Sequence, residues 1–150
     1  MLSAALVAFA HFLAFFALTA AVVVKLSLVS DALTVETAKR IRRADQAAGM
    51  SAVAVLVFGF LRVFYFEKGS DYYFDNTFFW LKLSLFFAAA LASIYPTLQF
   101  ASWRQALADN RAPEVSTETA ARIKKILHWE LIALAGVMLC ASLMAKGYGM

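Results

Sequence analysis

Apolar residues in this chain gather in four long runs that are separated by polar stretches. The runs cover about residues 2–24, 47–66, 78–100 and 127–145. A helix needs roughly 17 to 25 mostly apolar residues to cross a bilayer, and each run reaches this length. The pattern therefore predicts an all-α integral membrane protein, in which residues 1–150 form one domain and the spanning helices pack as a four-helix bundle.

Two of the helices are expected to start before their apolar runs. Thr34 is a candidate N-cap for a helix that begins near Thr37 and continues into the second run. Pro113 interrupts the third loop, and Ser116 or Thr117 after it can cap the last helix. Both helices should therefore extend beyond the bilayer.

The composition is that of a membrane protein. Hydrophobic residues make up 63% of the 150 positions, whereas about half is usual in a soluble domain, and the mean hydropathy is +0.71. No Lys or Arg precedes the first run, which is longer than the apolar core of a signal peptide, so we expect a retained helix. Cys140 is the one cysteine and has no partner for an internal disulfide.

Basic residues are concentrated in the first and third loops, whereas the second holds Lys68 with three acidic residues. Loops rich in Lys and Arg stay on the cytoplasmic side. We therefore predict that loops one and three are cytoplasmic and that both termini lie outside, in the periplasm, around a bacterial inner membrane. The net charge of +4 then faces lipid headgroups, which argues against nucleic acid as a partner. The basic residues are Lys25, Lys39, Arg40, Arg42 and Arg43 in loop one, and Arg104, Arg111, Arg122, Lys124 and Lys125 in loop three.

Five ionisable residues lie within or at the edges of the apolar runs. Because a charge at the centre of a spanning helix costs about 2.5 to 3.5 kcal/mol, the depth of each one matters. With a rise of about 1.5 Å per residue, Arg62 and Lys82 lie about one turn below the outer surface, and His11 lies near the middle of the bilayer. The other two, His128 and Glu130, lie near the cytoplasmic end.

Arg62 and Lys82 have two interpretations. Each alone can extend to the outer headgroups or pair with acidic residues of the second loop. Each also shares a helix face with small residues, which indicates that both point toward neighbouring helices, and His11 needs a partner or a ligand at mid-depth. Together the three predict an outer-side cationic pocket for an anion, most naturally the carboxylates of a flat amphipathic molecule such as haem or another porphyrin.

The two histidines cannot share one haem. His11 and His128 differ in depth by roughly 20 Å at about 1.5 Å per residue, so iron ligation is left to His11 alone, with Lys82 or water on the opposite side. We interpret His128 as an interfacial residue and Glu130 as an interfacial carboxylate. The candidate partners of Glu130 are Lys124, Lys125 and Arg104.

Five stretches carry a resemblance to a known family. They are "AHFLAFFAL" around His11, "GFLRVFYFEKG" around Arg62, "FFWLKLSLF" around Lys82, "SIYPTLQFASWR" and the terminal "LMAKGYG". Over almost the whole chain the sequence resembles a family of uncharacterised small bacterial four-helix membrane proteins, a domain of unknown function. The resemblance implies the fold but no particular activity.

More distantly, the layout resembles the flavin-free, membrane-embedded protoporphyrinogen oxidase of many bacteria. The polar positions of that family match His11, Lys82 in "WLKL" and Glu130 in "HWEL", and "AGM" at 48–50 is similar to its Pro-Gly-Met. Its Asn-Glu-x-Pro pattern in the fourth span and the histidine before the third-span lysine are absent. Together with the predicted cationic pocket, the resemblance implies catalytic roles for His11 and Lys82. It also implies a cofactor site with haem b bound to His11. The residues of this site are His11, Arg62, Lys82 and Glu130.

The sequence leaves three functional hypotheses. The first is a haem- or porphyrin-binding membrane oxidoreductase that passes electrons to a quinone or a respiratory-type membrane partner. The alternative is a non-catalytic membrane subunit or assembly factor of a larger complex. The third, a small transporter or proton path in a homo-oligomer with Lys82 and Glu130 at opposite ends, ranks last because four helices are few for a solute pathway. Motifs of soluble catalysis, such as a phosphate-binding glycine loop, are absent.

Overall fold

The computed structural model describes residues 2–66 and 70–149. All of its regular elements in these ranges are helices. They are α1 (Leu2–Leu28), α2 (Val35–Leu61), the π-helix η1 (Arg62–Phe66), α3 (Ser70–Phe74), α4 (Thr77–Ser102), α5 (Arg104–Ala108) and α6 (Thr117–Ala145). The stretches long and apolar enough to cross a membrane are Leu2–Leu28, Val35–Phe66, Thr77–Ala108 and Thr117–Ala145, which confirms the prediction of four spanning helices.

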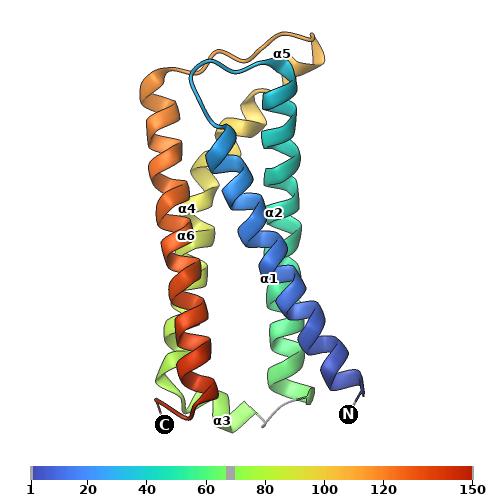
Figure 1. The fold of residues 1–150 in the computed structure, drawn as a ribbon, viewed down its shortest axis with the longest axis vertical. Coiled ribbons are helices and arrows are strands. Elements are labelled where there is room, and N and C mark those ends of the chain that lie inside the picture. The colour runs from blue at the N-terminus through green and yellow to red at the C-terminus, as the bar shows by residue number, and fades with distance from the viewer. Residues whose placement is uncertain (1, 67–69, 150) are drawn as a thin grey trace.

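The four long helices run side by side along the long axis of the molecule (Figure 1). Both termini and α3 lie at one end, which we call the α3 end. The opposite end, which we call the α5 end, carries α5 and the loops 29–34 and 109–116. Which end faces the cytoplasm stays a prediction.

The bundle consists of two helix pairs. α1 packs mainly against α2, and α4 packs mainly against α6, whereas contacts between the pairs are fewer. In Figure 1 the pairs approach each other toward the α5 end, where α1 crosses in front of α4, and they diverge toward the α3 end. The two ends of the seam between the pairs therefore differ, with a packed core at one end and space for a cavity at the other.

Two helix starts agree with the expected caps. The Thr34 hydroxyl accepts a hydrogen bond from the backbone N–H of Thr37 at 3.1 Å, and Ser116 does the same for Thr119 at 3.1 Å. Such a cap stabilises a helix by about 1 kcal/mol. Thr117 also donates to the Asp31 carboxylate at 2.7 Å, and this bond holds the pKa of Asp31 below its usual 3.8. It ties the first loop to the start of α6.

The first helix is longer than its apolar run. Residues 2–24 were expected to form the span, with Lys25 in the first loop, but α1 continues to Leu28 and buries Lys25 in its last turn. The lysine side chain is 1% exposed and forms an ion pair with Asp45 of α2. Only the assignment of Lys25 to the first loop was wrong: Asp45 compensates the lysine charge, and the helix continues past it.

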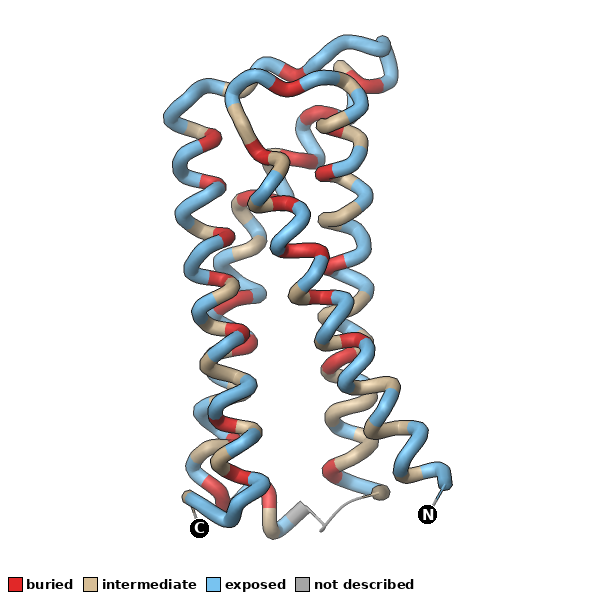
Figure 2. Tube along the Cα trace, viewed as in Figure 1, coloured by how far each residue is buried: buried red, intermediate tan, exposed pale blue. Residues whose placement is uncertain are grey.

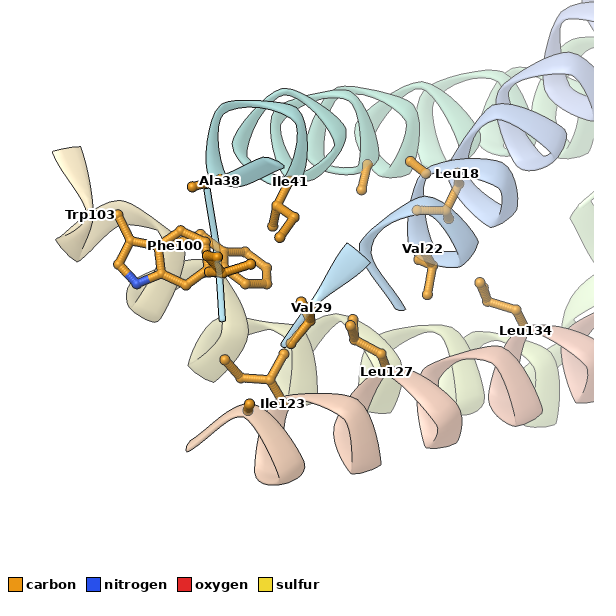
Figure 3. Close-up of a cluster of buried hydrophobic side chains, with 14 of the residues drawn as sticks. Leu18, Val22, Val29, Ala38, Ile41, Phe100, Trp103, Ile123, Leu127 and Leu134 are labelled. Atoms are coloured by element: carbon orange, nitrogen blue, oxygen red, sulfur yellow. The ribbon is translucent and has the colours of Figure 1, made fainter. Parts of the chain in front are cut away.

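The main core lies in the α5 half of the bundle. Val22, Ile41, Ile123 and Leu127, from three of the long helices, are completely buried, and Figure 3 shows these side chains gathered in one cluster. Figure 2 shows buried residues on the inward faces of the helices and exposed residues outside. The exposed surface includes large apolar side chains such as Phe16. Because the helices span a membrane, these side chains contact lipid.

Candidate ligand-binding cavity

A cavity of about 580 Å³ lies between the helix pairs in the α3 half of the molecule. Pockets for small molecules usually measure about 300 to 1,000 Å³. Its walls come from α1, α2, η1, α3, α4 and α6, and most of the lining side chains are aromatic or aliphatic. The basic residues in the described lining are His11, Arg62 and Lys82, and no Asp or Glu occurs among the described lining residues. The structure thus brings together three residues that the sequence singled out.

His11 is fixed by the neighbouring helix. Its Nδ1 lies 3.0 Å from the backbone carbonyl oxygen of Val55 in α2. A carbonyl oxygen only accepts, so Nδ1 carries the proton and donates, and in the neutral imidazole the lone pair is on Nε2. Gly59 makes room for the ring, because a Cβ at this position would lie 3.1 Å from His11 Cε1. Packing and hydrogen bonding therefore set both the position and the tautomer of His11.

Arg62 is the first residue of the π-helix η1, which follows α2 without a break. Its guanidinium carbon lies 5.0 Å from the centre of the Phe12 ring, within the range of a cation–π contact. A π-turn inserts extra backbone into a helix and is frequent at functional sites. The sequence did not indicate this turn, because its residues continue the apolar pattern of α2.

Lys82 approaches the cavity from α4. Its Nζ lies 5.0 Å from the centre of the Phe79 ring and 5.8 Å from that of Tyr73. The side chain is half-buried, as are those of His11 and Arg62. The cavity thus combines flat apolar walls with cationic groups from different helices.

Glu130 and His128 lie outside the cavity lining. His128 is exposed on α6, where its Nδ1 is 2.8 Å from the carbonyl oxygen of Lys124. Glu130 is 5% exposed, and the charged groups that act on it are Lys25 and Asp45. The candidate partners Lys124, Lys125 and Arg104 form no ion pair with Glu130 in the described residues.

Sequence reasoning missed the cluster of Lys25, Asp45 and Glu130. Lys25 and Asp45 stand at the edges of apolar runs, where charged residues normally face headgroups. Their signal in the sequence was the apolar residues after Lys25, which continue the helical pattern beyond the charge: Leu26, Leu28 and Val29. Asp45 carries a second bond, because the Thr97 hydroxyl of α4 donates to the same oxygen, Oδ1, at 3.1 Å. In the part of the chain that the structure describes, no group of three His, Cys, Asp or Glu side chains is arranged to hold a metal ion.

The helices and their composition define the class of this chain as an integral membrane protein with four spanning helices. Over residues 3–149 it matches the family described as "Predicted membrane protein (DUF2214)", and the chain belongs to this family. No curated protein and no solved structure matches the chain. The match confirms the resemblance to a membrane-protein family of unknown function and gives no support for the resemblance to protoporphyrinogen oxidase.

Proposed function

We propose that the protein binds a flat anionic molecule of the haem or porphyrin class in the cavity of the α3 half. The observation that carries the proposal is that His11, Arg62 and Lys82, from three helical segments, line one cavity whose other walls are mostly apolar. Basic side chains on the wall of a mostly apolar cavity favour an anionic ligand. A porphyrin suits this lining because it has a flat apolar ring and carboxylates at one edge.

Arg62 and Lys82 bind the carboxylates in this proposal. A guanidinium can donate two parallel hydrogen bonds to a carboxylate, whereas an ammonium acts as a compact charge. Both cations contact aromatic rings of the cavity wall, so their positions are restricted before a ligand arrives. The ring of the ligand then packs among aromatic residues such as Phe15 and Phe86.

His11 is suited to ligate iron. Histidines that bind metals usually donate their second N–H to a carbonyl or carboxylate, which fixes the ring, and His11 Nδ1 has such a partner in Val55. Nε2 is then the nitrogen that would bind the iron of haem b. When bound, haem supplies one-electron chemistry. With a metal-free porphyrinogen, the same nitrogen would accept a proton.

Oxidoreductase activity of the protoporphyrinogen oxidase type is the finer form of this proposal. It assigns proton transfer to His11 and carboxylate binding to Lys82, and it passes the electrons to a quinone in the membrane. Support comes from the position of both residues on the cavity wall. Glu130, which the resemblance also implicated, lies outside the described lining, so we give it no role in ligand binding.

The test is a titration of the detergent-purified protein with hemin and, separately, with metal-free protoporphyrin IX. His11→Ala should abolish the hemin Soret shift of an axial histidine yet leave protoporphyrin binding nearly unchanged. The matched control is His128→Ala, which removes an exposed histidine. Lys82→Met should weaken binding of both compounds, because loss of a charged hydrogen bond costs about 1.5 to 3 kcal/mol, or roughly ten- to a hundredfold in Kd. Lys124→Met should change neither.

Failure of the folded wild-type protein to bind either compound would overturn the proposal. The non-catalytic alternative would then gain support if a stoichiometric membrane partner co-purified and if the His11→Ala and Lys82→Met variants retained that partner. If protoporphyrin bound but its affinity did not depend on Lys82 or Arg62, the assignment of the carboxylate site would be wrong. Reduction of a soluble quinone by the protein with protoporphyrinogen tests the redox step.

A further inference from the structure

A second polar site lies across the seam between the helix pairs, toward the α5 end. Lys25 of α1 and Asp45 of α2 form an ion pair, with Nζ 3.0 Å from Oδ1. Thr97 of α4 donates to the same Asp45 oxygen at 3.1 Å. Glu130 of α6 completes the cluster, since Lys25 and Asp45 are the charges that act on its carboxyl group. Each of the four long helices thus contributes one side chain.

The charges of this cluster do not balance when all three groups are ionised. Lys25 and Asp45 neutralise each other, and Glu130 adds one negative charge. Lys25 is 1% exposed and Glu130 is 5% exposed, and the Glu130 oxygen Oε2 accepts no hydrogen bond from any residue that the structure describes. A buried carboxylate without donors costs several kcal/mol, whereas its protonated form is neutral and costs far less.

We propose that Glu130 is a proton-binding site within the membrane, and that the Lys25–Asp45 pair compensates its charge when the proton leaves. The proton departs to water as H⁺, and the carboxyl becomes a carboxylate. Lys25 has three N–H donors, one of which bonds Asp45, so the ammonium has donors left for the Glu130 carboxylate. No covalent or redox step is involved, and the site does not depend on the ligand proposed for the cavity.

The surroundings of Glu130 restrict which groups can take part. From α1 it faces Lys25 and from α2 Asp45, while α4 contributes the Thr97 hydroxyl through Asp45. Lys82, the one charged residue of α4, lines the cavity instead. On α6 itself the neighbouring ionisable residues are exposed: Lys124, Lys125 and His128. Lys25 is therefore the one cation among the described residues that faces the carboxyl group.

Proton occupancy has a structural consequence because the cluster joins the two helix pairs. Lys25 and Asp45 belong to the α1–α2 pair, whereas Thr97 and Glu130 belong to the α4–α6 pair. Loss of the proton draws Lys25 toward α6 and weakens its bond to Asp45. Uptake restores the neutral Glu130 and the Lys25–Asp45 ion pair. Protonation at Glu130 thus changes the electrostatic attraction across the seam.

Infrared spectroscopy of the full-length protein in lipid bilayers tests the proposal. A protonated carboxylic acid in an apolar site gives a carbonyl-stretch band that is separate from the amide bands and shifts in D₂O. We expect this band in the wild type at neutral pH and its loss at high pH. Glu130→Gln should remove it, whereas Glu118→Gln, a change at a side chain that is 85% exposed, should leave it unchanged. Asp45→Asn should weaken it, because Lys25 then pairs with Glu130.

Three outcomes would overturn the proposal. The first is absence of the band in the wild type at every pH, which needs no variant and so does not depend on how the variants fold. The second is survival of the band in the Glu130→Gln variant, provided that this variant is folded. Folding is shown by a size-exclusion elution volume and a circular dichroism spectrum that match those of the wild type. The third is loss of the band on addition of sodium at constant pH, since the site would then bind a cation and not a proton.

Discussion

The three basic residues of the cavity are each held by a contact with a neighbouring element. Arg62 lies over Phe12 and Lys82 lies over Phe79, in both cases at 5.0 Å from the ring centre. Such contacts contribute about 0.5 to 2 kcal/mol and use the face of the ring, so they are compatible with hydrogen bonds from the same cation to an anion. His11 is held by a carbonyl oxygen. The cavity is therefore organised by its own walls.

Gly59 is the position where a single methyl group tests this organisation. A Cβ there would lie 3.1 Å from Cε1 and 3.4 Å from Nδ1 of His11, so Gly59→Ala should displace the imidazole and weaken its bond to Val55. If His11 ligates haem iron, we expect hemin affinity to fall by about 1 kcal/mol, roughly fivefold, in the spectral titration. Gly49→Ala is the control, because a Cβ there meets nothing within 4 Å. Equal affinity in both variants would contradict the role of Gly59.

Residue chemistry explains which parts of the two sites could be predicted. Arg62 and Lys82 were recognised because they interrupt apolar runs, where a charged side chain is energetically costly and therefore rare. Lys25 and Asp45 did not, because they stand at the ends of runs, where a charge is ordinary. Their burial depends on how α1 crosses the other helices, and this crossing is a property of the whole bundle.

At the level of elements, the C-terminal tail is attached to the junction of α3 and α4. Asn76 is completely buried; its side chain caps α4 by accepting from the Phe78 N–H and donates to the Tyr148 carbonyl at 2.9 Å. The Thr77 N–H donates to the Gly149 carbonyl at 2.9 Å. This junction precedes Lys82 on the same helix, so the tail helps to set where α4 enters the cavity wall.

The tail contact predicts different effects for two glycines. Gly147 and Gly149 both have positive φ, 84° and 90°, so alanine strains the backbone at either position. A Cβ at Gly149 would also lie 2.6 Å from Phe78 Cδ2, whereas at Gly147 it meets nothing within 4 Å. Gly149→Ala should therefore lower stability by about 1 to 3 kcal/mol more than Gly147→Ala. Hydrogen exchange of the Thr77 amide measures detachment of the tail, and equal exchange in both variants would refute the contact.

Helix starts could be predicted from local chemistry, whereas the π-turn could not. Thr34 and Ser116 cap α2 and α6 as expected, because capping needs only a hydroxyl and the adjacent backbone. The change from α2 to η1 at Arg62 leaves no trace in residue types, since every residue of η1 after Arg62 is apolar or aromatic. It depends on packing with other elements.

For the molecule as a whole, the seam between the helix pairs carries both polar sites. The Lys25–Asp45–Glu130 cluster lies toward the α5 end, and the cavity lies toward the α3 end. The number of spanning helices followed from apolar length alone. Their pairing did not, because helices in lipid associate through small residues and close packing, and small residues recur along all four runs.

The direction of the bundle in the membrane is the prediction that involves the whole chain. With Lys25 buried, the exposed basic residues still concentrate at the α5 end, so the positive-inside rule places this end in the cytoplasm. The cavity then opens toward the periplasmic half and the Glu130 cluster lies nearer the cytoplasm. The contributing residues are Arg40, Arg43, Arg104, Arg111, Arg122, Lys124 and Lys125.

A pair of cysteine substitutions checks this direction in bacterial spheroplasts. In a Cys140→Ser background, which removes a buried thiol, we expect a membrane-impermeant thiol reagent to label Tyr148→Cys at the α3 end in sealed spheroplasts. Asp109→Cys at the α5 end should react only after permeabilisation. Both sites are exposed, with Tyr148 at 60% and the Asp109 side chain at 43%, so access to solvent is not limiting. The reverse labelling pattern would place the cavity on the cytoplasmic side, and an anionic ligand would then have to enter from the cytoplasm.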